Sequence, residues 1–208
     1  STGVREPVAA GSLYASDSQE LRSEIDAAIN GADSEFTSPK LLVVPDCGLA
    51  AAPHVAGAGM IMLETERDHV QRVVVISDYR PGIGGRDVQG IAIPRAIAFR
   101  TPLGDLLTDR AAIESLQGHP SVVINDRPFE KDTSIEVHLP PIQRLLGAVR
   151  IVPMLVGEAT TAEVVDAKPP TSGIVELSLT FSPTLLPRSL ILTFCRTSVS
   201  FSAASTAD

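Results

Sequence analysis

The sequence predicts an α/β protein with a central mixed, largely parallel sheet flanked by helices. Unbroken apolar segments rich in β-branched residues occur at Lys40–Pro45, Arg72–Ser77 and Arg150–Val156. Such segments are typical of strands that are covered on both faces. Helical patterns separate them, and alternation of strands with helices indicates the α/β class. The 208 residues, 44% of them hydrophobic, favour one domain over residues 1–208.

The clearest helix is expected at Ser18–Asn30, where Asp17 or Ser18 can cap the first turn. Its apolar positions recur at the helical spacing of three and four, at Leu21, Ile25, Ala28 and Ile29. Three further helices are expected: one that opens in Gly48–Gly59 and runs to Glu66, one at Thr108–Leu116, and one at Ser134–Leu146 that Pro140 and Pro141 should bend.

The remaining strands are short. We expect them at Gly90–Pro94, Ser121–Asn125, Gly173–Leu179, Ser189–Phe194 and Ser198–Ala203. The last three follow one another without helices between them, so we expect them to form a mixed or antiparallel edge of the sheet.

Composition argues against several classes of partner. The net charge is −8 and no cluster of Lys or Arg is visible along the chain, whereas nucleic acids and anionic membranes require such clusters. No apolar run reaches the roughly 18 residues of a membrane span. Cys47 and Cys195 are the two cysteines and can form at most one disulfide, which favours a reducing compartment. We therefore expect a soluble, cytoplasmic protein.

The residues alone point to no strong active site. Asp46, Cys47 and His54 follow a strand end and could in principle form a metal site, but such groupings often arise by chance. Glu136 and His138 are two positions apart, which places them on different faces of a helix. For that pair we expect one solvated and one packed side chain, not an acid–base couple.

Three segments together resemble a known family. Arg5–Tyr14 (REPVAAGSLY) is similar to R-x-P-x-x-A-G-x-F-Y-P, and Ala98–Ile113 to A-x-x-T-P-L-G-x-x-x-x-D. Ser134–Thr160 is similar to H-S-[LI]-E-[VM]-x-L-P followed by I-V-P-[LI]-L-V-G. In this order they resemble the Memo family, which includes the bacterial AmmeMemoRadiSam system protein B. The resemblance implies the fold of class III extradiol (LigB-type) dioxygenases, with a metal pocket at the strand ends.

The chain departs from the family where the resemblance places the metal ligands. The family's P-H-A-G, G-P-S-H and E-H-S-[LI]-E are replaced by PDCG, SDYR and DTSIE, which puts Asp46, Arg80 and Thr133 at histidine positions. An arginine has no lone pair to donate, and its charge repels a divalent cation. We therefore expect no metal, no cofactor and no catalytic residue. The resulting vestigial pocket would comprise Asp46, Cys47, Asp78, Arg80, Thr133 and Glu136.

These departures favour a catalytically silent Memo-like subunit that acts as a binding or structural partner. The partner would be a second copy or a metal-containing paralogue. A helical segment of the family that carries a pocket cysteine is missing here, so apolar surface should be uncovered. We expect partner contacts from six side chains: Leu177, Leu179, Phe181, Leu190, Leu192 and Phe194.

Two alternatives remain open from the sequence. One is a divergent non-haem, metal-dependent dioxygenase or oxidase that uses Asp46, Cys47 and His54. The other is binding of a small anionic metabolite in the vestigial pocket, with Arg80 holding the anion.

Overall fold

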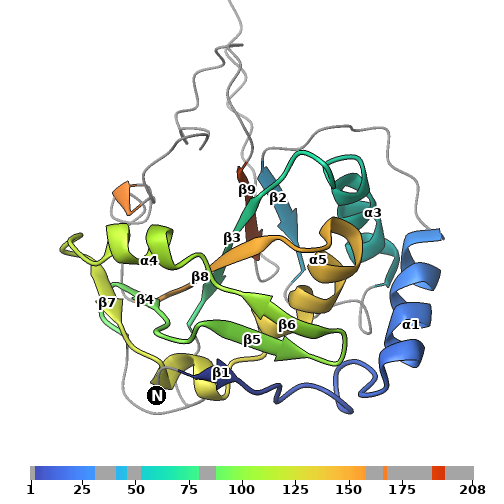
Figure 1. Cartoon of the computed structure of the whole chain (residues 1–208), viewed down its shortest axis with the longest axis horizontal. Coiled ribbons are helices and arrows are strands. Elements are labelled where there is room, and N and C mark those ends of the chain that lie inside the picture. Colours follow the sequence, from blue (N-terminus) through green and yellow to red (C-terminus); the bar gives the residue numbers. More distant parts are fainter. Residues whose placement is uncertain are drawn as a thin grey trace, which may run out of the picture.

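The computed structural model describes residues 3–30, 41–45, 53–79, 88–157 and 166–167, and the backbone of residues 189–194. Its described strands form a six-stranded sheet and a three-stranded sheet, shown in Figure 1. The six-stranded sheet has the order β2 (Leu41–Val44), β9 (Ser189–Phe194), β3 (Arg72–Asp78), β8 (Arg150–Val156), β4 (Ile91–Ile93) and β7 (Val122–Ile124). The smaller sheet has the order β1 (Val4–Arg5), β5 (Ala98–Thr101) and β6 (Gly104–Leu107).

The larger sheet is mixed. Strands β2, β9, β3 and β8 run parallel to one another, β4 is antiparallel to β8, and β7 is parallel to β4. Helices flank this sheet (Figure 1). The predicted α/β class with a mixed sheet is therefore confirmed.

The helices of the described part of the chain cover the two faces of the larger sheet unequally. Helices α1 (Ser18–Asn30), α3 (Pro53–Glu64) and α5 (Leu139–Leu146) contribute to the larger core cluster, and α4 (Arg110–Leu116) contributes to the smaller one. In β3, Val73 and Val75 belong to the first cluster and Val74 to the second. This strand is buried on both faces, as its apolar sequence predicts.

The first helix agrees with its predicted bounds. The Asp17 carboxylate caps it by accepting hydrogen bonds from the backbone N–H groups of Gln19 and Glu20, both at 2.9 Å. Its buried side chains are the four that the spacing predicts: Leu21, Ile25, Ala28 and Ile29. In the apolar strands, Leu42, Val44, Val74, Val152 and Leu155 are buried, while Ile76 and Val156 are half-buried.

The prediction that the β2 segment is covered on both faces is wrong. Leu42 and Val44 are buried, but Leu41 is 43% exposed and Val43 57% exposed. Strand β2 lies at the edge of the described sheet, and α3 packs only on the face that carries Leu42 and Val44. That helix approaches closely because it carries Gly59, whose added Cβ would lie 2.7 Å from the Val44 Cγ1.

The segment Ser134–Leu146 is not a single bent helix. A 3₁₀ turn, η2 (Glu136–His138), precedes α5, and Pro140 and Pro141 fall in the first turn of α5. Proline is tolerated there because the first N–H groups of a helix have no partner within it. Helix α3 also ends at Glu64, two residues before its predicted end.

Strand β9 is not part of an edge. It lies between β2 and β3 and runs parallel to both, so both of its backbone edges are hydrogen-bonded. The other late strands predicted at Gly173–Leu179 and Ser198–Ala203 lie outside the described residues.

Truncating Leu42 tests the placement of β2. The Leu42→Ala change should lower the free energy of unfolding by about 2–5 kcal/mol, because the side chain is only 5% exposed and its loss leaves a cavity. Leu41→Ala, next to it on the exposed face, is the matched control and should cost below about 0.5 kcal/mol. Equal losses in urea unfolding would contradict this arrangement.

Candidate functional site

The described residues cover half of the predicted vestigial pocket. Asp46, Cys47 and Arg80 lie outside them. Asp78 is the last residue of β3 and is exposed, and Thr133 is half-buried in the loop before η2. Glu136 differs from both, because its side chain is only 1% exposed.

The Glu136 carboxylate lies at the centre of a buried polar network. Its Oε1 accepts hydrogen bonds from the Tyr14 hydroxyl at 2.6 Å and from the Ala9 N–H at 2.8 Å. The Val8 N–H donates to both carboxylate oxygens at 3.0 Å, and the Arg5 guanidinium forms an ion pair with Oε2. We call these five residues the Arg5–Glu136 network.

Arg5 also contacts three other groups. Its Nε donates to the Phe129 carbonyl oxygen at 2.9 Å, and its Nη2 donates to the Asp132 carbonyl oxygen at 2.5 Å. The guanidinium lies over the Phe99 ring, 5.6 Å from the ring centre, in a cation–π contact. Arg5 therefore joins β1 to the segment that leads into η2.

Burial controls the protonation of this region. Burial, the hydrogen bond to Glu136 and the Glu136 charge all raise the pKa of Tyr14, so its phenol remains a hydrogen-bond donor. Burial also raises the pKa of Asp132, against the hydrogen bonds from Ser134 and Ile135. Burial lowers the pKa of His138 to about 3, which keeps its imidazole neutral at neutral pH.

The expectation of one solvated and one packed side chain at Glu136 and His138 is wrong. Both are 1% exposed. Both lie on a 3₁₀ turn. The N-terminal residues Val8 and Ala9 cover the Glu136 side chain, which would otherwise be exposed to solvent.

The network leaves the Glu136 carboxylate poorly suited to act as a base or a metal ligand. A base or a metal ligand needs an accessible lone pair, whereas the Glu136 oxygens already accept from four groups in a buried position. Sequence reasoning assigned no role to Arg5, Val8, Ala9 or Tyr14, although all four lie in the REPVAAGSLY motif.

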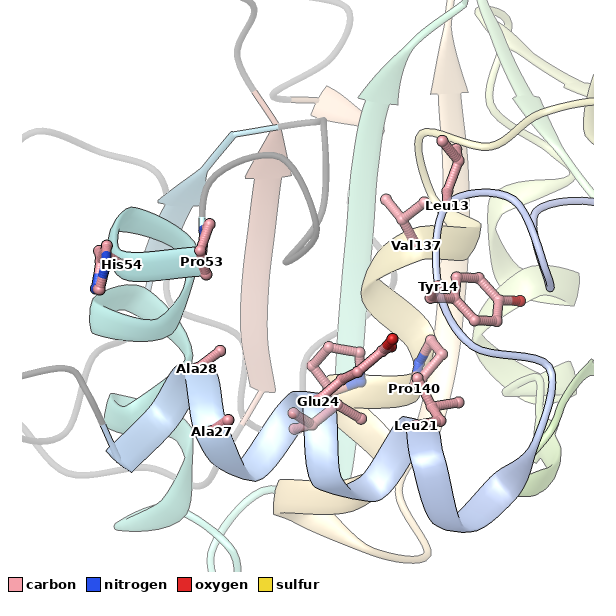
Figure 2. A pocket seen from close by; sticks show the side chains of 12 residues that line it. Leu13, Tyr14, Leu21, Glu24, Ala27, Ala28, Pro53, His54, Val137 and Pro140 are labelled. Atoms are coloured by element: carbon pink, nitrogen blue, oxygen red, sulfur yellow. The ribbon is translucent and has the colours of Figure 1, made fainter.

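An apolar groove of about 310 Å³ lies beside the network (Figure 2). It is bounded by α1, the start of α3 and the η2–α5 segment, and Tyr14 joins its wall to the network. Figure 2 shows His54 on the α3 end of this groove, apart from Glu24. Within the described residues no group of three or more His, Cys, Asp or Glu side chains is arranged to hold a metal ion.

No helix among the described residues has the length and apolar character required to cross a membrane.

Comparisons with known proteins give a consistent result. The profile of the family described as "Memo-like protein" matches residues 5–168. A "MEMO1 family protein" of Pyrobaculum aerophilum is 31% identical over 169 residues, which are 76% of this chain and 57% of that protein. The "Protein memo-1 homolog" of Caenorhabditis elegans is 28% identical over 151 residues, 71% of this chain and 41% of that protein. The chain thus spans about half the length of these relatives.

Proposed function

Since this chain belongs to the Memo-like protein family, we propose that it is a catalytically silent member that acts as a binding or structural partner in a larger assembly. Its partner would be a second copy of the chain or a metal-containing paralogue. We also propose that residues 1–208 form one domain with the fold of class III extradiol dioxygenases.

The observation that carries this proposal is the burial of Glu136. By its resemblance to the family motif this carboxylate belongs to the pocket. Arg5 neutralises it, and Tyr14, Val8 and Ala9 donate hydrogen bonds to it. A carboxylate used in this way stabilises the fold and is not free for chemistry.

The residues at the expected ligand positions support the same conclusion. Iron and copper prefer imidazole and carboxylate donors, whereas Arg80 has no lone pair to donate and the Thr133 hydroxyl is a poor ligand. Asp46 alone retains a group that suits a metal.

We expect the purified protein to hold no stoichiometric transition metal through Asp46, Arg80 and Thr133. Elemental analysis of the wild type and of Asp46→Ala is the measurement. A content near one iron, copper or zinc per chain that disappears in Asp46→Ala would contradict the proposal and support the dioxygenase alternative.

Exposed apolar side chains support the partner role. On the outer face of β2, Leu41 and Val43 are exposed, and among the described strands β2 pairs only with β9. An edge strand with apolar side chains tends to pair with another chain unless it is covered. Of the six partner contacts proposed from the sequence, Leu190, Leu192 and Phe194 lie on β9. Both edges of this strand are already hydrogen-bonded, to β2 and to β3. Backbone pairing with a partner at this end of the sheet would therefore use β2.

We expect the isolated chain not to be a free monomer at micromolar concentration. Light scattering measures this, and Val43→Lys should weaken the association by about tenfold or more, because it puts a charge on the β2 face. Val123→Lys on β7, at the other end of the sheet and also exposed, is the matched control. A monomeric wild type that binds no apolar dye would refute the partner role.

A further inference from the structure

A second groove, of about 590 Å³, lies where β8 begins, next to α1, α5 and β6. We propose that this groove binds a small organic anion that carries at least two negative charges, of the phosphate-ester class. It is separate from the vestigial pocket. Arg72 and Arg150 pair where β3 and β8 begin, whereas Asp78 pairs with Val156 where they end, about 20 Å away at the usual rise per residue.

Four arginines from separate segments meet in this groove: Arg22, Arg67, Arg144 and Arg150. Among the described residues of its lining, Asp105 is the only acidic side chain, and it accepts a hydrogen bond from Arg100 at 2.8 Å. In a chain with a net charge of −8, this is a local excess of positive charge that the linear sequence does not reveal. Such an excess raises the local concentration of anions.

Two of the four guanidinium groups are held in place by the fold. Arg67 donates to the carbonyl oxygens of Leu145 and Arg144, at 2.8 and 2.9 Å, and so caps the end of α5. Arg144 in turn donates to the Asp26 carboxylate at 3.1 Å. Arg67 therefore supplies positive charge that needs no ordering when a ligand binds, whereas Asp26 offsets the charge of Arg144.

The other two guanidinium groups belong to exposed side chains. The side chains of Arg22 and Arg150 form no hydrogen bond or ion pair with another described residue. Burial raises the pKa of Asp109. Hydrogen bonds from Ala112 and Arg72, together with the charge of Arg150, outweigh burial, so the pKa of Asp109 is below its ordinary value. Arg150 therefore lies near this carboxylate but is not bonded to it.

The size and lining of the groove indicate the class of ligand. Its volume falls in the range of small-molecule sites, and guanidinium groups match phosphate oxygens in pairs. The buried side chains of Leu106 and Val149, together with the exposed Leu107, form apolar walls for an organic body. Carboxylates share part of this chemistry, so the test must separate them from phosphates.

Isothermal titration of the full chain with inorganic pyrophosphate, at about 0.1 M ionic strength, tests the proposal. We expect saturable binding at one site. Arg22→Gln and Arg150→Gln should each weaken it by about tenfold or more, because each removes a charge-assisted contact. Arg110→Gln on α4 removes the same charge outside the groove and should change the affinity by less than about twofold.

Because Arg22 and Arg150 are exposed, their variants should fold, and circular dichroism checks this. Absence of saturable binding up to about 10 mM would overturn the proposal, as would equal losses in all three variants. Citrate serves as the carboxylate probe. Weaker binding of citrate than of pyrophosphate supports the phosphate class, and equal or tighter binding of citrate overturns it.

Discussion

Glu136→Gln should lower the free energy of unfolding by about 3–5 kcal/mol. Removal of one partner from a buried ion pair leaves the other charge without compensation, and the Arg5 side chain is only 8% exposed. Urea unfolding followed by circular dichroism measures the loss. The matched control is Glu114→Gln, which removes the exposed partner of Arg110 on α4 and should cost no more than about 0.5 kcal/mol.

Tyr14→Phe provides a milder test of the same network. It keeps the ion pair and removes one hydrogen bond to a charged group, for which we expect a loss of about 1.5–3 kcal/mol. The expected order of losses is Glu136→Gln, then Tyr14→Phe, then Glu114→Gln. A loss below about 1 kcal/mol in Glu136→Gln would show that the network does not stabilise the fold.

This result also bears on function. Active-site carboxylates are often retained at a cost in stability, so replacing one tends to leave stability unchanged or to raise it. A large loss at Glu136 is the opposite outcome and supports a structural role. A stable Glu136→Gln variant would remove this support for a structural role of Glu136.

Local sequence was sufficient to predict some elements. The helix α1 carries a cap at Asp17 and apolar residues at helical spacing, and both features depend only on neighbouring residues. The β-branched run of β3 is covered on both faces as expected. The equally apolar β2 is not, because whether a strand lies at the edge depends on distant partners such as β9.

Other features of the structure leave no recognisable pattern in the local sequence. The small sheet was missed because β1 has two residues and β5 and β6 have four each, too few for a clear alternation. Arg5 and Glu136 are 131 positions apart, and one sequence gives no sign that they form an ion pair. The arginines of the second groove are likewise scattered along the chain.

The stability of the protein should fall as the pH is lowered below about 6.5, in part because of His138. Burial lowers the pKa of this imidazole to about 3 in the folded chain, whereas an unfolded histidine titrates near 6.5. Between these values the unfolded state binds a proton that the folded state does not, so stability rises with pH through this window. The contribution of His138 is complete above about pH 6.5, and about 2 kcal/mol of it is lost at about pH 5.

Urea unfolding at about pH 7.5 and about pH 5 isolates this contribution. His138→Leu will change the absolute stability, so the informative quantity is the difference between the two pH values. That difference should be about 2 kcal/mol smaller in His138→Leu than in the wild type, because the variant has no imidazole to protonate on unfolding. His54→Gln removes an exposed imidazole and should keep the wild-type difference. If His138→Leu kept it as well, the imidazole at position 138 would have to be accessible to protons in the folded chain, which would contradict its burial.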